Sequence, residues 1–165
     1  MPQRIIGWDI GGAHIKVAVL EANGTVSNIY QLPCPLWKGL EFLNQAVLKI
    51  LKKISDSQCK HAITMTGELV DLFDSRDHGV ALIIKAMQDS LAGQKLLIYA
   101  GIDGFLKPDH ILQKHYGSIA SANWLASASL AASKLKNGLF IDIGSTTTDI
   151  LVLVDGNVEA IGLTD

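Results

Sequence analysis

Two segments far apart in the sequence place an aspartate directly before a turn of glycine and small polar residues. Asp9 precedes Gly11 and Gly12, Asp142 precedes Gly144, and apolar runs flank both segments. Backbone N–H groups in such a tight turn form a concave nest that suits phosphate oxygens. A carboxylate at the preceding strand end could hold Mg²⁺ through water, since this ion dehydrates reluctantly. The two segments therefore predict a site for a phosphorylated small molecule, with Asp9 and Asp142 as metal ligands and candidate catalytic residues.

The two segments are copies of one longer pattern. Residues 9–20 align with residues 142–153, and Asp, Ile, Gly, Val and Leu recur in register. Each copy then reaches a second turn signal, Asn-Gly ending at Gly24 in the first and Asp-Gly ending at Gly156 in the second. The repeat therefore predicts two equivalent three-stranded meanders, each opening with a phosphate-binding turn.

Backbone amides, hydroxyls and one lysine around the turns are the groups that we expect to contact the phosphate or nucleotide. Hydroxyls after the second glycine turn would add donors, and Lys16 would add positive charge. The full expected set is Gly11, Gly12, Ala13, Lys16, Thr66, Gly67, Gly144, Ser145, Thr146 and Thr147.

The same residues have structural alternatives that the sequence leaves open. The glycines could serve tight hairpins alone, and residues 146–148 could be ordinary β-forming threonines. Alternation along the strand could turn Lys16 toward solvent, and His14 fits a turn residue better than a ligand. Asp149 could be an exposed strand residue or a carboxylate of the binding cleft.

Apolar periodicity predicts an alternation of strands and helices around these turns. A period of three and four from Leu40 to Ile54 indicates an amphipathic helix, and alanine and serine fill another helix that Asn137 and Gly138 end. The expected strands are 5–10, 15–19, 25–32, 61–66, 96–100, 139–143 and 148–154, and the expected helices are 38–53, 80–91 and 117–136.

Composition narrows the classes of function. The net charge of −2 gives no basic surface for nucleic acid, and no apolar run reaches the length that spans a bilayer. A strand begins almost at the N-terminus, which leaves no room for a signal peptide, so we expect a cytoplasmic protein without a membrane partner. The two isolated cysteines, Cys34 and Cys59, fit small buried hydrophobes rather than a disulfide framework or a zinc site.

The paired motifs resemble the phosphate-binding motifs of the superfold that actin, sugar kinases and heat-shock ATPases share. More narrowly, DIGGAHIK at 9–16 and DIGSTTTD at 142–149 resemble the hydantoinase A/oxoprolinase family. MTGELVD at 65–71, ANWLA at 122–126 and GLTD at 162–165 are similar to one of its subfamilies, which is associated with tetrahydromethanopterin-linked one-carbon transfer. The archaeal members of that subfamily join an aminomethylfuran diphosphate to a tyramine-derived phenol in methanofuran biosynthesis.

This resemblance implies an α/β fold: a ribonuclease H-like (actin-like ATPase) domain with a mixed sheet, plus the first strands of a second such domain. The implied domains are 1–115, a connecting helix 116–137, and an incomplete second domain 138–165, since family members have about twice this length. It also implies Mg²⁺ with ATP or a diphosphate-bearing substrate, and Glu68 as an acid/base or metal-linked carboxylate. Glu68 could equally be a carboxylate at a helix N-terminus. An incomplete second sheet would leave an apolar face through which the chain could form a homo-oligomer.

The resemblance implies a Mg²⁺-dependent phosphate- or nucleotide-binding enzyme, a transferase with a diphosphate leaving group. Two other functions are alternatives to it. An ATP-dependent small-molecule kinase of the sugar-kinase type would need a catalytic aspartate in the cleft, which no motif singles out. A non-catalytic module that senses a nucleotide or directs assembly would bind ligand tightly without forming product.

Overall fold

The computed structural model describes residues 3–54, 59–143 and 148–159. The chain divides into two compact units, Met1–Ala122 and Asn123–Asp165, and each is treated by itself below. In the described part, no helix combines the length and the apolar composition that crossing a membrane requires.

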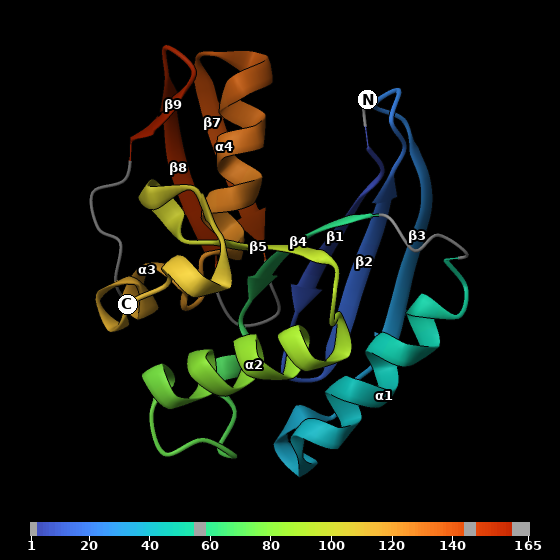
Figure 1. The fold of residues 1–165 in the computed structure, drawn as a ribbon. Coiled ribbons are helices and arrows are strands. Elements are labelled where there is room, and N and C mark those ends of the chain that lie inside the picture. Colours follow the sequence, from blue (N-terminus) through green and yellow to red (C-terminus); the bar gives the residue numbers. More distant parts are fainter. Residues whose placement is uncertain (1–2, 55–58, 144–147, 160–165) are drawn as a thin grey trace. The chain divides into compact units, whose positions relative to one another are not determined.

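The first unit is built on a mixed sheet of six strands in the order β3-β2-β1-β4-β5-β6 (Figure 1). The first three strands form an antiparallel meander, β4 and β5 continue the sheet in parallel, and β6 closes it antiparallel to β5. The strands are β1 Ile5–Ile10, β2 His14–Leu20, β3 Val26–Pro33, β4 Lys60–Met65, β5 Lys95–Tyr99 and β6 Phe105–Leu106.

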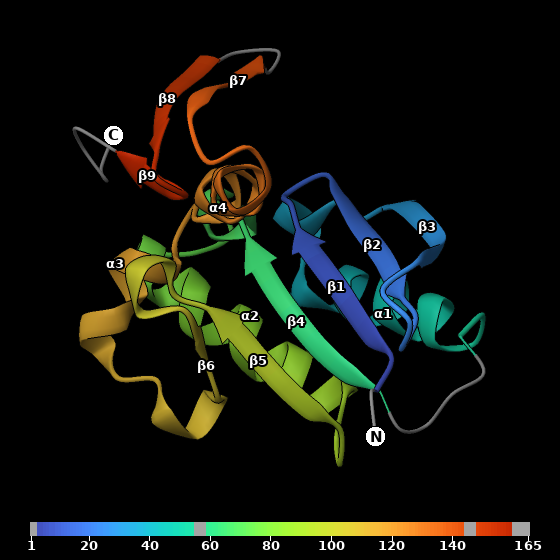
Figure 2. The same ribbon diagram turned by 90° about the horizontal axis from the view of Figure 1, so that it is seen from above.

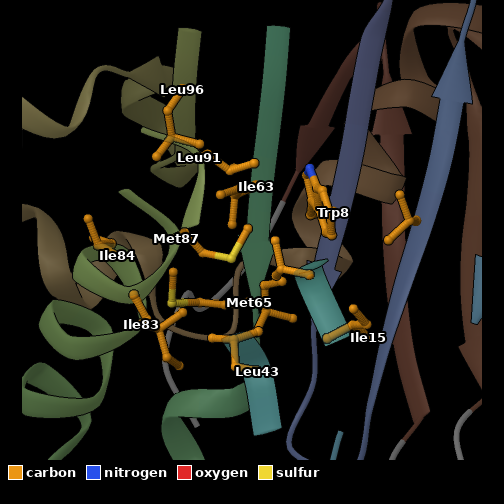
Figure 3. Packing of buried hydrophobic residues seen from close by; sticks show 14 of the residues in the cluster. Trp8, Ile15, Leu43, Ile63, Met65, Ile83, Ile84, Met87, Leu91 and Leu96 are labelled. Atoms are coloured by element: carbon orange, nitrogen blue, oxygen red, sulfur yellow. The ribbon is translucent and has the colours of Figure 1, made fainter. Parts of the chain in front are cut away.

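Two helices, α1 (Leu40–Leu51) and α2 (Arg76–Ser90), lie along one face of this sheet (Figure 2). The buried positions of α1 follow its three-and-four spacing, as its sequence predicts. Figure 3 shows Ile63 and Met65 of β4 in one apolar layer with residues of α2 and with Trp8 of β1. This layer holds the strands rigidly, so the turns at their ends are fixed in position.

Because side chains alternate along β1, some point into this core and others point to the opposite face of the sheet. Ile6, Trp8 and Ile10 are buried at 2% exposure or less, whereas Asp9 lies between them on the opposite face of the sheet. The strand thus carries its aspartate to the face away from α1 and α2.

A polar pair inside the core links β1 to β4. Trp8 Nε1 donates a hydrogen bond of 3.0 Å to His61 Nδ1, and the two rings stack with centroids 5.9 Å apart. His61 is 1% exposed, and burial lowers its pKa from 6.5 to about 4. The imidazole is therefore neutral at pH 7, which leaves Nδ1 available to accept the tryptophan N–H.

His61 should make folding stability depend on pH in mild acid. Because its folded pKa lies below the unfolded value of 6.5, the unfolded chain binds more protons, and stability falls as the pH drops from about 6.5 toward 4. The shift corresponds to a loss of about 3 kcal/mol, which urea unfolding across this pH range measures. His61→Gln should flatten that part of the profile. Equal pH slopes in the wild type and His61→Gln would contradict this account.

The second unit holds α4 (Asn123–Leu135) and an antiparallel sheet of three strands, β7 (Gly138–Ile143), β8 (Thr148–Val154) and β9 (Asn157–Glu159). Within this unit α4 packs on all three strands. The β8–β9 turn places Asp155 and Gly156 at φ +50° and +81°, as an Asp-Gly hairpin turn requires. β7 and β8 repeat the pairing of β1 and β2, with Asp142 opposite Asp149 as Asp9 is opposite Lys16.

Two helices differ from the sequence-based expectation. The single helix expected over 117–136 is two helices, α3 (Tyr116–Ile119) and α4, because Ala120 turns extended and Ser121 adopts φ +54°. The helix expected from residue 80 begins at Arg76, where Ser75 caps it by accepting from the His78 N–H at 3.1 Å. Its first turn is polar, so apolar periodicity alone placed the start too late.

Candidate functional site

The turns after β1 and β4 lie next to each other at one edge of the first sheet. The two strands run parallel with Ile10 opposite Met65, so both chains leave the sheet at the same level. The Thr66 N–H donates to the Ile10 carbonyl at 3.0 Å, and a Cβ on Gly67 would lie 3.1 Å from that same oxygen. The structure therefore brings the expected residues Gly11 and Gly12 together with Thr66 and Gly67.

The glycine turn leaves two N–H groups without an acceptor among the described residues. The Gly11 N–H donates to the His14 carbonyl at 3.0 Å, which closes the turn. The carbonyls of Gly12 and Ala13 accept from the N–H groups of Leu36 and Cys34 at 2.9 and 2.8 Å. Across the described part of the chain, no backbone acceptor is found for the N–H groups of Gly12 and Ala13. These two consecutive amides are the groups that an anion could bind.

Glycine at position 12 is a steric requirement of this turn. A Cβ there would lie 2.6 Å from Cγ1 of Val70, which follows the neighbouring turn. A side chain at this position would thus force the Val70 side chain or the two turns to shift, independently of any role in binding.

The Asp9 carboxylate has one paired and one unpaired oxygen. Oδ2 accepts from Lys16 Nζ at 3.3 Å, whereas Oδ1 is buried and has no hydrogen-bond partner among the described residues. The Thr64 hydroxyl, which lies on β4 opposite Asp9, is buried and unpaired in the same sense. A buried polar atom without a partner is costly, so these two oxygens mark a place for a ligand, ion or water.

The structure shows the positions of Lys16 and His14, whose roles the sequence left open. The Lys16 side chain is 61% exposed and pairs with Asp9, so its charge lies beside the carboxylate. His14 begins β2 with an exposed side chain. Thr64 is a residue that sequence reasoning missed, because only the parallel pairing of β1 with β4 places it next to Asp9.

Glu68 is buried in a short 3₁₀ turn, Gly67–Leu69, directly after the Thr66–Gly67 backbone. It is 2% exposed, and its Oε1 accepts from the Ser121 hydroxyl at 2.8 Å. Ser121 in turn accepts from Arg76 Nη2 at 3.1 Å. Oε2 is buried without a partner in the described part of the chain. The chain of donors from Arg76 through Ser121 orients the carboxylate, and its second oxygen stays buried and unpaired among the described residues.

Ser121 explains why the expected continuous helix breaks. Its left-handed backbone is uncommon for a residue other than glycine, and a contact elsewhere must stabilise it. Its hydroxyl supplies that contact by bonding Glu68, which is 53 residues earlier in the chain.

The glycine turn of the second repeat, between β7 and β8, is described only at its flanking strands. Gly144, Ser145, Thr146 and Thr147 lie outside the described residues. Asp142 and Asp149 are cross-strand partners on β7 and β8, so two carboxylates occupy the positions that Asp9 and Lys16 hold in the first repeat. Like charges directly opposite each other are unfavourable unless a cation lies between them.

Neither cysteine belongs to this site. Cys34 and Cys59 are buried, and burial raises the pKa of the Cys34 thiol to about 11, so it stays protonated and unreactive at neutral pH. In the ranges that the structure describes, no cluster of three or more histidine, cysteine or carboxylate side chains could hold a metal by itself.

The sequence is similar to a known protein family and to one curated enzyme. The model of the hydantoinase/oxoprolinase family matches residues 60–163. The (4-{4-[2-(gamma-L-glutamylamino)ethyl]phenoxymethyl}furan-2-yl)methanamine synthase of Methanocaldococcus jannaschii is 31% identical over 158 residues, which are 94% of this chain and 45% of that protein. The chain therefore spans less than half of the length of this curated relative.

Solved structures share the fold at low sequence identity. A Ppx/GppA phosphatase from Aquifex aeolicus has a TM-score of 0.55 at 11% identity, with 96% of this chain and 50% of that chain covered. A ROK-family glucokinase from Streptomyces griseus has a TM-score of 0.53 at 12% identity, covering 94% and 46%. The ethanolamine utilization protein EutJ from Carboxydothermus hydrogenoformans has a TM-score of 0.52 at 16% identity, covering 97% and 51%.

These likenesses confirm the expected fold class, a ribonuclease H-like domain of the actin-like ATPase type followed by the first strands of a second. They concern the fold alone, whereas the family match covers more than half of the sequence and includes the Thr66–Gly67 turn, Glu68 and Asp142. The chain belongs to the hydantoinase/oxoprolinase family.

Proposed function

We propose that the protein is part of a Mg²⁺-dependent transferase that binds a diphosphate-bearing substrate and serves methanofuran-type cofactor synthesis. The observation that carries the proposal is the edge of the first sheet, where two amides of the glycine turn lie beside a turn that carries a buried carboxylate; both amides and one carboxylate oxygen are unpaired in the described part of the chain. The similarity to the furan-methanamine synthase supports this substrate class. Because the chain spans 45% of that relative, the activity is proposed for a polypeptide of the relative's length.

The turn residues would bind the diphosphate. The N–H groups of Gly12 and Ala13 donate to its oxygens, and the Thr66 hydroxyl lies beside the same turn, 3.8 Å from where a Cβ of Gly11 would be. Fixed donors of this kind stabilise negative charge as it develops on a leaving group, because they need no reorganisation during the reaction. Gly144 to Thr147 would supply a second set of donors.

The residues present fit Mg²⁺, which prefers carboxylate oxygens and water. Asp9 has a buried Oδ1 without a partner in the described part of the chain, and Asp142 lies opposite Asp149 on the neighbouring strand. Asp9 and Asp142 would hold the ion. The ion would supply positive charge that neutralises the departing diphosphate.

Glu68 would act as the general base. In the proposed transfer, a phenol oxygen attacks the methylene carbon of an aminomethylfuran diphosphate, a C–O ether bond forms, and the bond from carbon to the diphosphate oxygen breaks. The phenol proton passes to Oε2 of Glu68, and diphosphate leaves with the electron pair of the broken bond. Ser121 holds the other oxygen of Glu68 at 2.8 Å and thereby fixes the direction of the free one.

Asp149→Asn tests the cation part of the proposal. Removing one of two opposed carboxylates should raise the free energy of unfolding by about 0.2–1 kcal/mol in a Mg²⁺-free buffer, because a like-charge contact is lost. It should also remove most of the added stability that millimolar Mg²⁺ gives the wild type. Thermal unfolding with and without Mg²⁺ measures both effects. Destabilisation without Mg²⁺, together with an unchanged response to Mg²⁺, would contradict the assignment.

A product assay tests the proposed reaction. A polypeptide of the relative's length is incubated with an aminomethylfuran diphosphate, a tyramine-derived phenol and Mg²⁺, and diphosphate release and ether formation are measured. We expect both products in equal amounts and at least a 100-fold lower rate for Glu68→Gln. Release of ADP from ATP with a sugar or carboxylate acceptor, without ether formation, would replace the proposal with a kinase function. Tight ligand binding without product would favour the sensing or assembly module.

A further inference from the structure

Two side chains on neighbouring strands of the first sheet have buried oxygens that lack a hydrogen-bond partner among the described residues. They are Asp9 on β1, through Oδ1, and Thr64 on β4, through its hydroxyl. The two residues lie directly opposite each other in the parallel pairing of these strands, which Figure 2 shows side by side. Buried polar atoms of native proteins are nearly always paired, so each oxygen is expected to contact a ligand, an ion or water.

Strand alternation places both side chains on the same face of the sheet. Ile63 and Met65 of β4 are buried in the core at 1% and 0% exposure, and Thr64 lies between them. Thr64 therefore points away from α1 and α2, as Asp9 does. Because neighbouring strands lie about 4.8 Å apart, paired residues on one face have adjacent side chains.

The two oxygens do not pair with each other, although their residues are adjacent. A hydroxyl can donate to a carboxylate, and such a bond would satisfy both atoms at once. The other carboxylate oxygen of Asp9 is already used, since Oδ2 accepts from Lys16 Nζ at 3.3 Å. Lys16 belongs to β2, on the side of β1 away from β4. Oδ1 and the Thr64 hydroxyl are thus placed to share a third group.

A hydrated cation fits both oxygens best. The carboxylate repels an anion but attracts a cation, and the Asp9 side chain is 25% exposed, so an ion can reach it from solvent. Mg²⁺ keeps several of its waters when it binds to proteins, and those waters donate hydrogen bonds. A hydroxyl oxygen can accept such a bond, as a carboxylate oxygen can. A water molecule alone would also pair both oxygens, but it would leave the carboxylate charge without compensation.

We propose that Thr64 is a positioning residue of the cation site, whose hydroxyl holds a water of the Mg²⁺ shell beside Asp9 Oδ1. This inference rests on the proposed function, since it concerns the ion that Asp9 would bind. Side chains that bond to the ligands of a metal fix those ligands and thereby raise the affinity. Asp9 and Thr64 each lie two positions before a turn residue, Gly11 and Thr66. The strands would therefore hold the ion, and the turn amides would bind the phosphate.

Thr64→Val tests the inference, because valine keeps the β-branched shape and removes the hydroxyl. In Mg²⁺-free buffer this variant should unfold at a higher temperature than the wild type, since a buried unpaired hydroxyl is replaced by a methyl group. Its affinity for Mg²⁺ should be about 10- to 100-fold weaker. Thermal unfolding and calorimetric titration of Mg²⁺ into the whole chain measure the two effects.

Two further variants separate the hydroxyl from the packing of the side chain. Thr64→Ser keeps the hydroxyl and should bind Mg²⁺ nearly as tightly as the wild type. Asp9→Asn combined with Thr64→Val should bind no more weakly than Asp9→Asn alone, because residues that hold the same ion have non-additive effects.

Three results would overturn the inference. Wild-type affinity for Mg²⁺ in Thr64→Val would remove Thr64 from the cation site and leave the role of Asp9 intact. Equal losses of affinity in Thr64→Val and Thr64→Ser would assign the effect to packing rather than to the hydroxyl. If Mg²⁺ neither binds to the wild type nor changes its unfolding temperature, the proposed cation site itself is wrong, and this inference fails with it.

Discussion

Gly79→Ala is expected to lower the free energy of unfolding of the first unit by about 1–3 kcal/mol, the cost of overpacking a rigid site. Alanine inside a helix usually stabilises by up to about 1 kcal/mol relative to glycine, so propensity alone predicts the opposite sign. At this position of α2, however, a Cβ would lie 2.9 Å from both Cα and Cβ of Glu68 and 2.7 Å from Cδ2 of Phe73. The Phe73 ring can move, but the Glu68 backbone is held by its neighbours.

Gly117→Ala provides the control, because a Cβ on Gly117 of α3 would meet no atom within 4 Å. It should be neutral or stabilise slightly, and urea unfolding of both variants gives the comparison. The Gly79 variant should also weaken ligand binding, since the added carbon displaces the residue that carries the proposed base. A gain of stability in both variants would contradict this prediction, because it would mean that the space between α2 and Glu68 can hold an added methyl group.

Replacing both Asp9 and Asp142 by asparagine is expected to weaken Mg²⁺-dependent binding of pyrophosphate or ATP at least 100-fold while the protein stays folded. Each substitution keeps the shape of the side chain and removes the charge that would hold the ion. The cost in stability should be within about 1 kcal/mol, because the ion pair that Asp9 loses has a lysine side chain that is 61% exposed. Calorimetric titration measures the affinity, and circular dichroism checks the fold.

Asp89→Asn is the matched control for this double variant. Asp89 pairs with Lys85 at 3.2 Å on α2, much as Asp9 pairs with Lys16 at 3.3 Å, but it lies far along the chain from either glycine turn. It should bind ligand like the wild type. Unchanged affinity in the double variant would remove both aspartates from the site.

Local sequence patterns predicted the strands and turns well because their causes are local. The apolar run 5–10 and the glycines at 11–12 predict β1 and its turn with little help from the rest of the chain. The Asp-Gly pair at 155–156 likewise specifies its hairpin. Asp9 and the glycine turn could thus be identified from the sequence alone.

The remaining features depend on contacts between distant residues. Thr64 joins Asp9 only through the pairing of β4 with β1, which no short pattern reveals. The break at Ser121 depends on its hydrogen bond to Glu68, so an alanine-rich pattern suggested one continuous helix. The apolar alternation of β8 predicted a strand, but the burial of each face depends on which helices are present.

The most direct test of the account is a calorimetric titration of pyrophosphate, ATP and ADP into this chain and into a polypeptide of the relative's length, with and without Mg²⁺. We predict saturable binding of pyrophosphate that requires Mg²⁺ and shows no preference for adenosine. Binding that occurs only in the longer polypeptide would place part of the site in the segment that the relative has outside its match with this chain. If neither polypeptide binds any of these ligands, the two glycine turns are structural hairpins and the proposed phosphate site is wrong.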